Sequence, residues 1–230
     1  MNRHFLILSF LIPVIFFYNC DNSPTTADQI EINFDPINLD VRIFLMESPA
    51  SPGLTATVNE NEVKKLMEGV NEVWEQANIQ WEIERIQIID ALNGEDYERM
   101  LRGEIGLTTS LLISTIPDGV IQSDSWDIFL INELTGGIGG VYLPHITSVM
   151  QPETDPLGVS GLQGGLTRIL AHELGHSLTL NHVPCTSQGN LMAAGCPQGV
   201  RTRLTQIQID ASRNQAASNR PAGSNPDVTI

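Results

Sequence analysis

Two histidines and a glutamate within residues 172–176 have a spacing suited to metal chemistry. His172 and His176 stand four residues apart, and a helix predicted over residues 166–180 places both side chains on one face. Both imidazoles can then reach one Zn²⁺ at ~2.0–2.1 Å. Glu173 is offset by one residue, so its carboxylate is expected beside a water at the metal and not on the metal. The pattern predicts a zinc site with a general base; the alternative is a helix whose charged residues only face solvent.

His182 is the candidate for a third ligand. A helix that simply continued past His176 would rotate His182 by about 240° away from it, at 100° per residue. His182 therefore reaches the same metal only if the helix ends and the chain turns back between these two histidines. The other histidine after the N-terminal segment, His145, follows Pro144 and is expected in a surface loop.

Residues 172–182 resemble the zinc signature HExxHxxGxxH of the metzincin metallopeptidases, with the matrixins as the nearest subgroup. Residues 190–192, Asn-Leu-Met, resemble the Met-turn of that family, whose methionine forms an apolar floor beneath the metal. Close resemblance covers about residues 166–195. It implies a Zn²⁺ cofactor with the ligands His172, His176 and His182, the general base Glu173, and the Met-turn residue Met192.

A rival zinc arrangement is excluded by the sequence. Thermolysin-like enzymes add a downstream glutamate ligand to HExxH, and the chain contains no glutamate after Glu173. The later carboxylates are Asp210, within a predicted helix, and Asp227, within a tail rich in Pro, Asn and Ser. His182 is therefore the best third ligand.

One position departs from the metzincin signature. The family has glycine where the chain leaves the zinc helix, and Thr179 stands there in this chain. A β-branched residue adopts a positive φ only at a cost, whereas asparagine tolerates it better. We therefore expect the turn to slide to Asn181, which is adjacent to His182.

The elements that must position this site are predicted from hydrophobic periodicity. An apolar stripe predicts a helix over residues 63–77, which Asn59 or Asn61 would cap. A change of parity near residues 84–85 predicts a bulge in the strand over residues 79–88. Further strands are predicted over residues 39–46, 111–116 and 126–131, a flexible glycine-rich turn over residues 136–140, and a closing helix over residues 206–217.

With the resemblance, this order implies an α+β, metzincin-like fold. It consists of a twisted, mostly parallel sheet with two long helices and a small C-terminal subdomain after the third histidine. The resemblance also implies that an edge strand at Val141, Tyr142 and Leu143 pairs with an extended substrate. Specificity is then expected from a pocket beside Met192 and Ala193.

The N-terminus carries an export signal. Arg3 and His4 precede an apolar stretch over residues 5–17, which is too short for the ~20 residues of a membrane-spanning helix. Residues 1–19 are therefore predicted to be a signal peptide. Cys20 follows at once and resembles the lipidated cysteine of a bacterial lipoprotein, with residues 20–37 as anchor and tether. The alternative is an ordinary signal peptide and a protein secreted without lipid.

The two remaining cysteines form an even pair. In an oxidising, extracytoplasmic setting, Cys185 and Cys196 are predicted to form a disulfide. The alternative is a pair of free or metal-binding thiols, although the CxxC spacing of thiolate zinc sites is absent.

Composition limits the partners. The chain has 230 residues, 27 acidic against 12 basic, and a formal net charge of −15 with 41% hydrophobic residues. This suits one folded domain, predicted over residues 38–218, followed by a disordered tail over 219–230. The acidic balance excludes a nucleic-acid binder and disfavours an anionic membrane surface, so membrane contact is expected only through the lipid anchor.

The expected function is a zinc-dependent endopeptidase that cleaves extracytoplasmic proteins as a monomer, facing the bacterial periplasm or lying on the cell surface. The alternative is a non-catalytic or weakly active surface lipoprotein that uses the same scaffold to bind a partner. Glu173 favours the enzyme, because a structural zinc site has four protein ligands and needs no general base.

Overall fold

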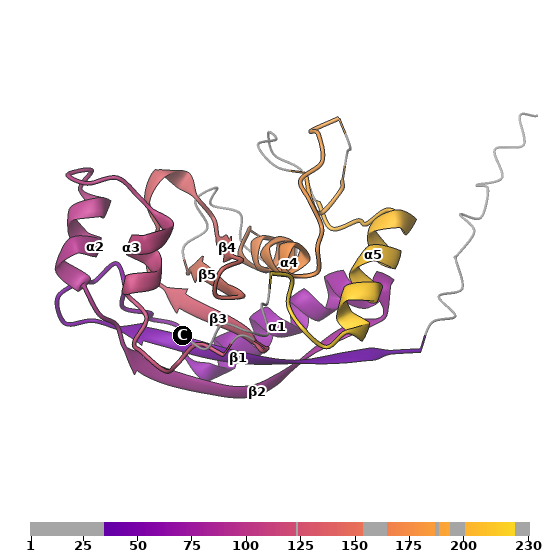
Figure 1. Cartoon of the computed structure of the whole chain (residues 1–230), viewed down its shortest axis with the longest axis horizontal. Helices are drawn as coiled ribbons and strands as arrows, with labels where there is room; N and C mark the ends of the chain where they lie inside the picture. Colours follow the sequence, from indigo (N-terminus) through magenta and orange to yellow (C-terminus); the bar gives the residue numbers. More distant parts are fainter. Residues whose placement is uncertain (1–34, 123, 154–164, 187–188, 194–200, 224–230) are drawn as a thin grey trace, which may run out of the picture. The chain divides into compact units, whose positions relative to one another are not determined.

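The protein's computed structural model describes residues 35–122, 124–153, 165–186, 189–193 and 201–223. Within these residues the chain forms a five-stranded sheet of order β2-β1-β3-β5-β4 (Figure 1). Four strands are parallel, and β4 is antiparallel to β5. The strands are β1 (Ile37–Glu47), β2 (Ile79–Asp90), β3 (Trp126–Ile131), β4 (Val141–Leu143) and β5 (Ser148–Pro152). The predicted α+β fold with a mostly parallel sheet is confirmed.

Helices cover both faces of this sheet. The α-helices are α1 (Glu60–Trp74), α2 (Gly94–Leu101), α3 (Thr109–Ser114), α4 (Gly165–Ser177) and α5 (Gln206–Ala217), and the short 3₁₀ helices are η1 (Glu75–Ala77) and η2 (Thr135–Gly137). One set of β1 side chains, including Val41 and Ile43, joins a core with α1, α4 and α5. The alternate set, including Phe44, packs with α2 and α3. None of the helices in the described part of the chain is both long and apolar enough to cross a bilayer.

The start of α1 follows the sequence prediction. Asn59 accepts hydrogen bonds from the backbone N–H groups of Asn61 and Glu62, and the Glu62 side chain accepts one from Asn59 in return. This capping box satisfies donors that the first helical turn leaves without partners. The buried side of α1 carries the predicted stripe, which includes Val63, Met67, Val70 and Trp74.

The predicted bulge in β2 is present. Val41 of β1 pairs with Ile83, but the next residue, Arg42, pairs with Arg85, so Glu84 is the extra residue of the bulged strand. One inserted residue reverses the face on which each following side chain points. This explains why the apolar residues of β2 change parity along the strand.

The prediction of a strand over residues 111–116 is wrong, because this segment contains the helix α3. Thr108 caps it by accepting a hydrogen bond from the Leu111 N–H, and Leu112 and Ile116 are buried against the α2 side of the sheet. These two side chains lie four residues apart, which is also the spacing of one helical face. A short apolar run fits a helix and a strand equally well, so periodicity could not decide.

A buried ion pair joins β1 to β3. The Arg42 guanidinium donates to both carboxylate oxygens of Asp127 at 2.7 and 2.6 Å, and both side chains are excluded from solvent. The two residues are also register partners in the parallel pairing of these strands. Breaking such a pair leaves one charge buried without compensation, which costs far more than loss of a surface pair.

We therefore expect Asp127→Asn to lower the free energy of unfolding by about 3–5 kcal/mol, because Arg42 stays charged and buried. Urea denaturation of the purified protein measures this loss. The matched control is Asp96→Asn, which removes an exposed pair with Arg99 and should cost at most about 1 kcal/mol. Equal losses in the two variants would contradict the importance of the buried pair.

Candidate active site

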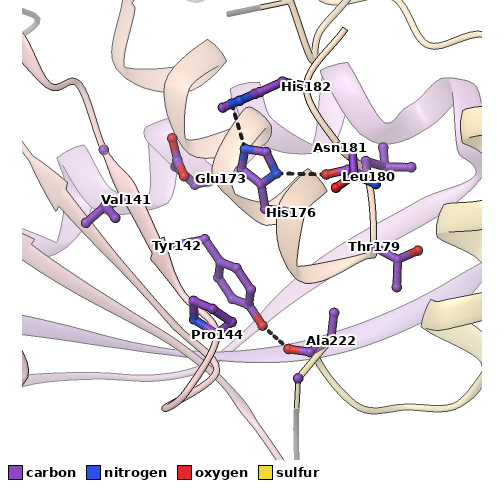
Figure 2. A pocket seen from close by; sticks show the side chains of 12 residues that line it. Val141, Tyr142, Pro144, Glu173, His176, Thr179, Leu180, Asn181, His182 and Ala222 are labelled. Carbon is purple, nitrogen blue, oxygen red and sulfur yellow. Dashed lines mark hydrogen bonds between the residues drawn. The ribbon is translucent and has the colours of Figure 1, made fainter. Parts of the chain in front are cut away.

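Three histidine side chains meet at the C-terminal end of α4. The Nε2 atoms of His172 and His176 are 3.2 Å apart, and the Nε2 atom of His182 lies 3.1 Å from the first and 3.0 Å from the second. This is the arrangement of ligand atoms that surround one ion. Figure 2 shows His182 reaching back over His176 from the segment after the helix.

The proton positions of two of these histidines are fixed by backbone carbonyls. The Nδ1 atom of His172 lies 2.8 Å from the Leu191 oxygen, and that of His176 lies 2.7 Å from the Leu180 oxygen. A carbonyl only accepts, so each Nδ1 carries the proton and each Nε2 turns its lone pair toward the common point. Burial lowers the pKa of His172 to about 4 and also lowers that of His176. Neutral imidazoles that converge in this way fit a zinc ion.

The turn after α4 brings the third histidine back. The Leu180 N–H donates to the Gly175 oxygen at 3.0 Å, and the Thr179 N–H donates to the His176 oxygen at 3.1 Å. These two bonds form the Schellman pattern, in which the residue after the cap adopts a left-handed conformation. That residue is Thr179, with φ of 70°, and Asn181 is not among the described residues with positive φ. The expectation that the turn would slide to Asn181 is therefore wrong.

The position of Leu180 explains why the turn occurs at Thr179. The Leu180 side chain is buried in the same core as α1 and α4, and its carbonyl orients His176. Moving the turn toward Asn181 would remove Leu180 from both roles. Thr179 itself is exposed, and its hydroxyl donates to the Leu178 oxygen at 2.6 Å. The structure thus accepts a left-handed threonine, at a cost of about 1–2 kcal/mol, in order to bury its neighbour.

Glu173 lies beside the histidine cluster without being part of it. Its side chain is only 8% exposed, and burial raises its pKa to about 7, partly offset by a hydrogen bond from the backbone of Tyr142. A carboxyl group with a pKa near neutrality can both accept and release a proton in that pH range. The structure therefore places a proton-transfer group next to the candidate metal ligands.

Glu173, His176 and His182 open onto a cavity of about 530 Å³ (Figure 2). Its other walls come from three segments: the β4 edge, the turn after α4 and a segment near the C-terminus. These supply Gly140, Val141, Tyr142, Pro144, Thr179, Leu180, Asn181, Ala222 and Gly223. The sequence placed the specificity pocket beside Met192 and Ala193, but neither residue lines this cavity. Of the predicted substrate-binding strand, Val141 and Tyr142 do line it, and Leu143 is buried.

Met192 lies beneath the helix that carries the histidines. It is fully buried, and a Cβ atom placed on Gly175 would approach its Sδ atom to 2.6 Å. Gly175 thus allows the methionine to pack close under α4. The Met192 N–H donates to the Asn190 side chain at 2.9 Å, and its carbonyl accepts from Val183 at 3.0 Å. The role of Met192 as the floor of a Met-turn stays a prediction.

Gly140 is a site residue that the sequence interpretation missed. A Cβ atom there would lie 2.9 Å from Ile169 and 3.0 Å from the Cγ of Glu173. The glycine-rich run was interpreted only as a flexible turn, yet its last residue lets the β4 edge come close to the general-base candidate. Its position directly before the predicted edge strand was the available signal.

The predicted cysteine modifications stay predictions. Cys20 and Cys196 lie outside the described residues, so neither lipidation nor the disulfide with Cys185 is tested by the structure. The same holds for the signal peptide over residues 1–19. Of the predicted tail, residues 219–223 are described, and Ala222 and Gly223 line the cavity, whereas residues 224–230 are not described.

Comparisons with known proteins give structural matches only. No protein-family model matches the chain, and no curated protein matches it. The crystal structure of archaemetzincin from Methanopyrus kandleri is similar at a TM-score of 0.50 and 11% identity, over 78% of this chain and 96% of that one. The fold is metzincin-like. The three-histidine cluster in this fold suggests a metal ion, with zinc as the ion that suits three imidazole ligands.

Two further structures are similar at lower scores. Metalloproteinase-II from Bacteroides fragilis has a TM-score of 0.43 and 15% identity, over 78% of this chain and 53% of that one. A chaperone-substrate complex has a TM-score of 0.46 and 13% identity, over 80% of this chain and 35% of that one. The chain thus spans about half, or less, of these two proteins.

We expect His182→Ala to weaken zinc binding by more than about a hundredfold, because loss of a direct ligand should exceed the 10–100-fold cost of losing a supporting group. Competition with a zinc-sensitive dye measures the affinity. His145→Ala is the matched control, since His145 is exposed and outside the cluster. Undiminished zinc binding without His182 would contradict the three-histidine site.

We expect Thr179→Gly to raise the free energy of unfolding by about 1 kcal/mol, because glycine adopts φ of 70° without steric cost. Asn181→Gly serves as the control and should give no gain, because Asn181 has no positive φ to relieve. Urea denaturation of both variants in the same metal state distinguishes the two positions. A gain in the free energy of unfolding for Asn181→Gly, with none for Thr179→Gly, would contradict the assignment of the backbone strain to Thr179.

Proposed function

We propose that this protein is a zinc-dependent endopeptidase of the matrixin-like type, with His172, His176 and His182 as zinc ligands. The observation that carries the proposal is the position of Glu173, which is buried on the helix that carries His172 and His176 and lines the same cavity as His176 and His182. A structural zinc site needs no such group. When bound at these nitrogens, zinc would act as a Lewis acid that makes water nucleophilic near neutral pH.

Glu173 performs the proton transfers in this mechanism. Its carboxylate, whose pKa is raised by burial, accepts a proton from the attacking water and delivers it to the leaving amine of the peptide. The Tyr142 backbone holds the carboxylate in place by a hydrogen bond. Glu173 is almost fully buried and still lines the cavity, so its carboxylate can reach a water molecule there.

The edge of the sheet supplies a binding surface for an extended substrate. In the described sheet β4 is the last strand, paired with β5 on one side only. An edge strand presents backbone groups that can pair with a peptide, independently of its side chains. Protein or peptide substrates therefore bind along Val141, Tyr142 and Leu143, with the scissile bond near Glu173.

The site of action is proposed from the sequence. We propose an exported monomer anchored by a lipid on Cys20, with Cys185 and Cys196 joined in the oxidising compartment. Equal incorporation of labelled fatty acid into the wild type and Cys20→Ser would contradict the anchor.

The rival role, a scaffold that binds a partner without hydrolysis, loses its main support. Thr179 in the place of the family's glycine would favour this role only if the turn could not form, and the structure forms the required turn with threonine. A binding scaffold also gives no reason for a buried glutamate beside the histidines.

We expect Glu173→Gln to reduce casein cleavage by at least about 10²–10⁴-fold while zinc stays bound, because the proton acceptor is lost and the ligands are not. Zinc content and cleavage are measured on the same samples, with a chelator-treated wild type as the blank. Glu72→Gln, an exposed change on α1, is the matched control and should retain full activity. Loss of zinc in Glu173→Gln would move this residue onto the metal and contradict the mechanism.

A further inference from the structure

A short segment near the C-terminus is fixed against the end of α4. The Ala222 N–H donates to the Ser177 oxygen at 2.7 Å, and Pro221 beside it is buried. The Schellman bonds use the carbonyls of Gly175 and His176, so the Ser177 carbonyl is the next one at the helix end and takes its partner from Ala222. The segment therefore completes the capping of the helix that carries two of the histidines.

Ser177 is a rigid point of attachment. It is fully buried, its hydroxyl donates to the Leu174 oxygen at 2.6 Å, and the same hydroxyl accepts from the Trp126 Nε1 at 3.0 Å. Trp126 belongs to β3, so the attachment extends from the C-terminal segment through α4 into the sheet. A segment held in this way has a defined position relative to the histidines.

The other side of the segment is attached to the β4 edge. The Tyr142 hydroxyl donates to the Ala222 carbonyl, as Figure 2 shows. A Cβ atom on Gly223 would approach the Pro144 oxygen to 2.8 Å, and Gly223 has φ of 82°. The positive φ and the close approach to Pro144 each require glycine at residue 223. The segment therefore lies in close contact with the loop after β4.

From this geometry we infer that Ala222 and Gly223 are specificity-determining residues that form one wall of the pocket for a substrate side chain next to the scissile bond. Both line the same cavity as Glu173, His176 and His182. Their small size keeps the cavity open, so a larger side chain at residue 222 would occupy the space that the substrate needs. The inference rests on the proposed peptidase function and names residues far in sequence from the zinc signature.

The lining also indicates which side chains are accepted. Apart from Glu173 and the two histidines, the described residues around the cavity are uncharged, and Val141, Tyr142, Pro144 and Leu180 are among them. The pocket therefore suits a large uncharged side chain, such as phenylalanine or leucine.

The test measures binding and not turnover, in full-length, zinc-loaded protein. Two short peptide hydroxamates serve as zinc-directed probes that differ only in carrying phenylalanine or alanine next to the chelating group. In Ala222→Phe the preference for the phenylalanine probe should fall at least about tenfold relative to the wild type. Ala222→Gly should keep or increase that preference. Ala217→Phe makes the same change at an exposed position on α5 and should leave the preference unaltered.

The outcomes separate this inference from the proposed function. An unchanged preference in Ala222→Phe, or equal loss of both probes with zinc retained, would overturn the assignment of the wall. A shifted preference in a protein that cleaves neither casein nor peptides would support the wall and overturn the peptidase proposal. Failure of the wild type to bind zinc would overturn both.

Discussion

The Nε2 lone pairs of His172 and His176 point toward each other at 3.2 Å and repel, unless a cation lies between them. The described structure is organised to hold them in this arrangement. The Leu191 and Leu180 carbonyls fix two rings through their Nδ1 protons, the Met192 side chain supports the helix from below, and the turn at Thr179 returns the third ring. The positions of the three histidines thus depend on backbone groups and core packing as well as on their own spacing.

Much of this arrangement was predictable because it depends on spacing. Two histidines four residues apart face the same way on any helix, and a parity change in a strand requires an inserted residue. Both features therefore could be inferred from the positions of residues alone. The α5 helix and the Asn59 cap were equally local, since their signals lie within a few residues of one another.

Features that depend on distant contacts could not be predicted in this way. The segment of α3 carries apolar residues that suit either a helix or a strand, and its packing against the α2 side of the sheet decides between them. The preference of asparagine for a left-handed conformation pointed to Asn181, but burial of Leu180 outweighs that local preference. The role of Ala222 depends on a hydrogen bond to Ser177, far away in sequence, and no local pattern indicates it.

The attachment of Ala222 to Ser177 also bears on the order in which the parts of the site can form during synthesis. Ribosomes make the chain from its N-terminus, so all three histidines and Met192 are synthesised before Ala222. A nascent chain can thus hold every metal ligand while the last turn of α4 still lacks a partner for the Ser177 carbonyl and the cavity still lacks one wall. Within the described fold, the three histidines can therefore come together before the cavity gains the wall that Ala222 contributes through its hydrogen bonds to Ser177 and Tyr142.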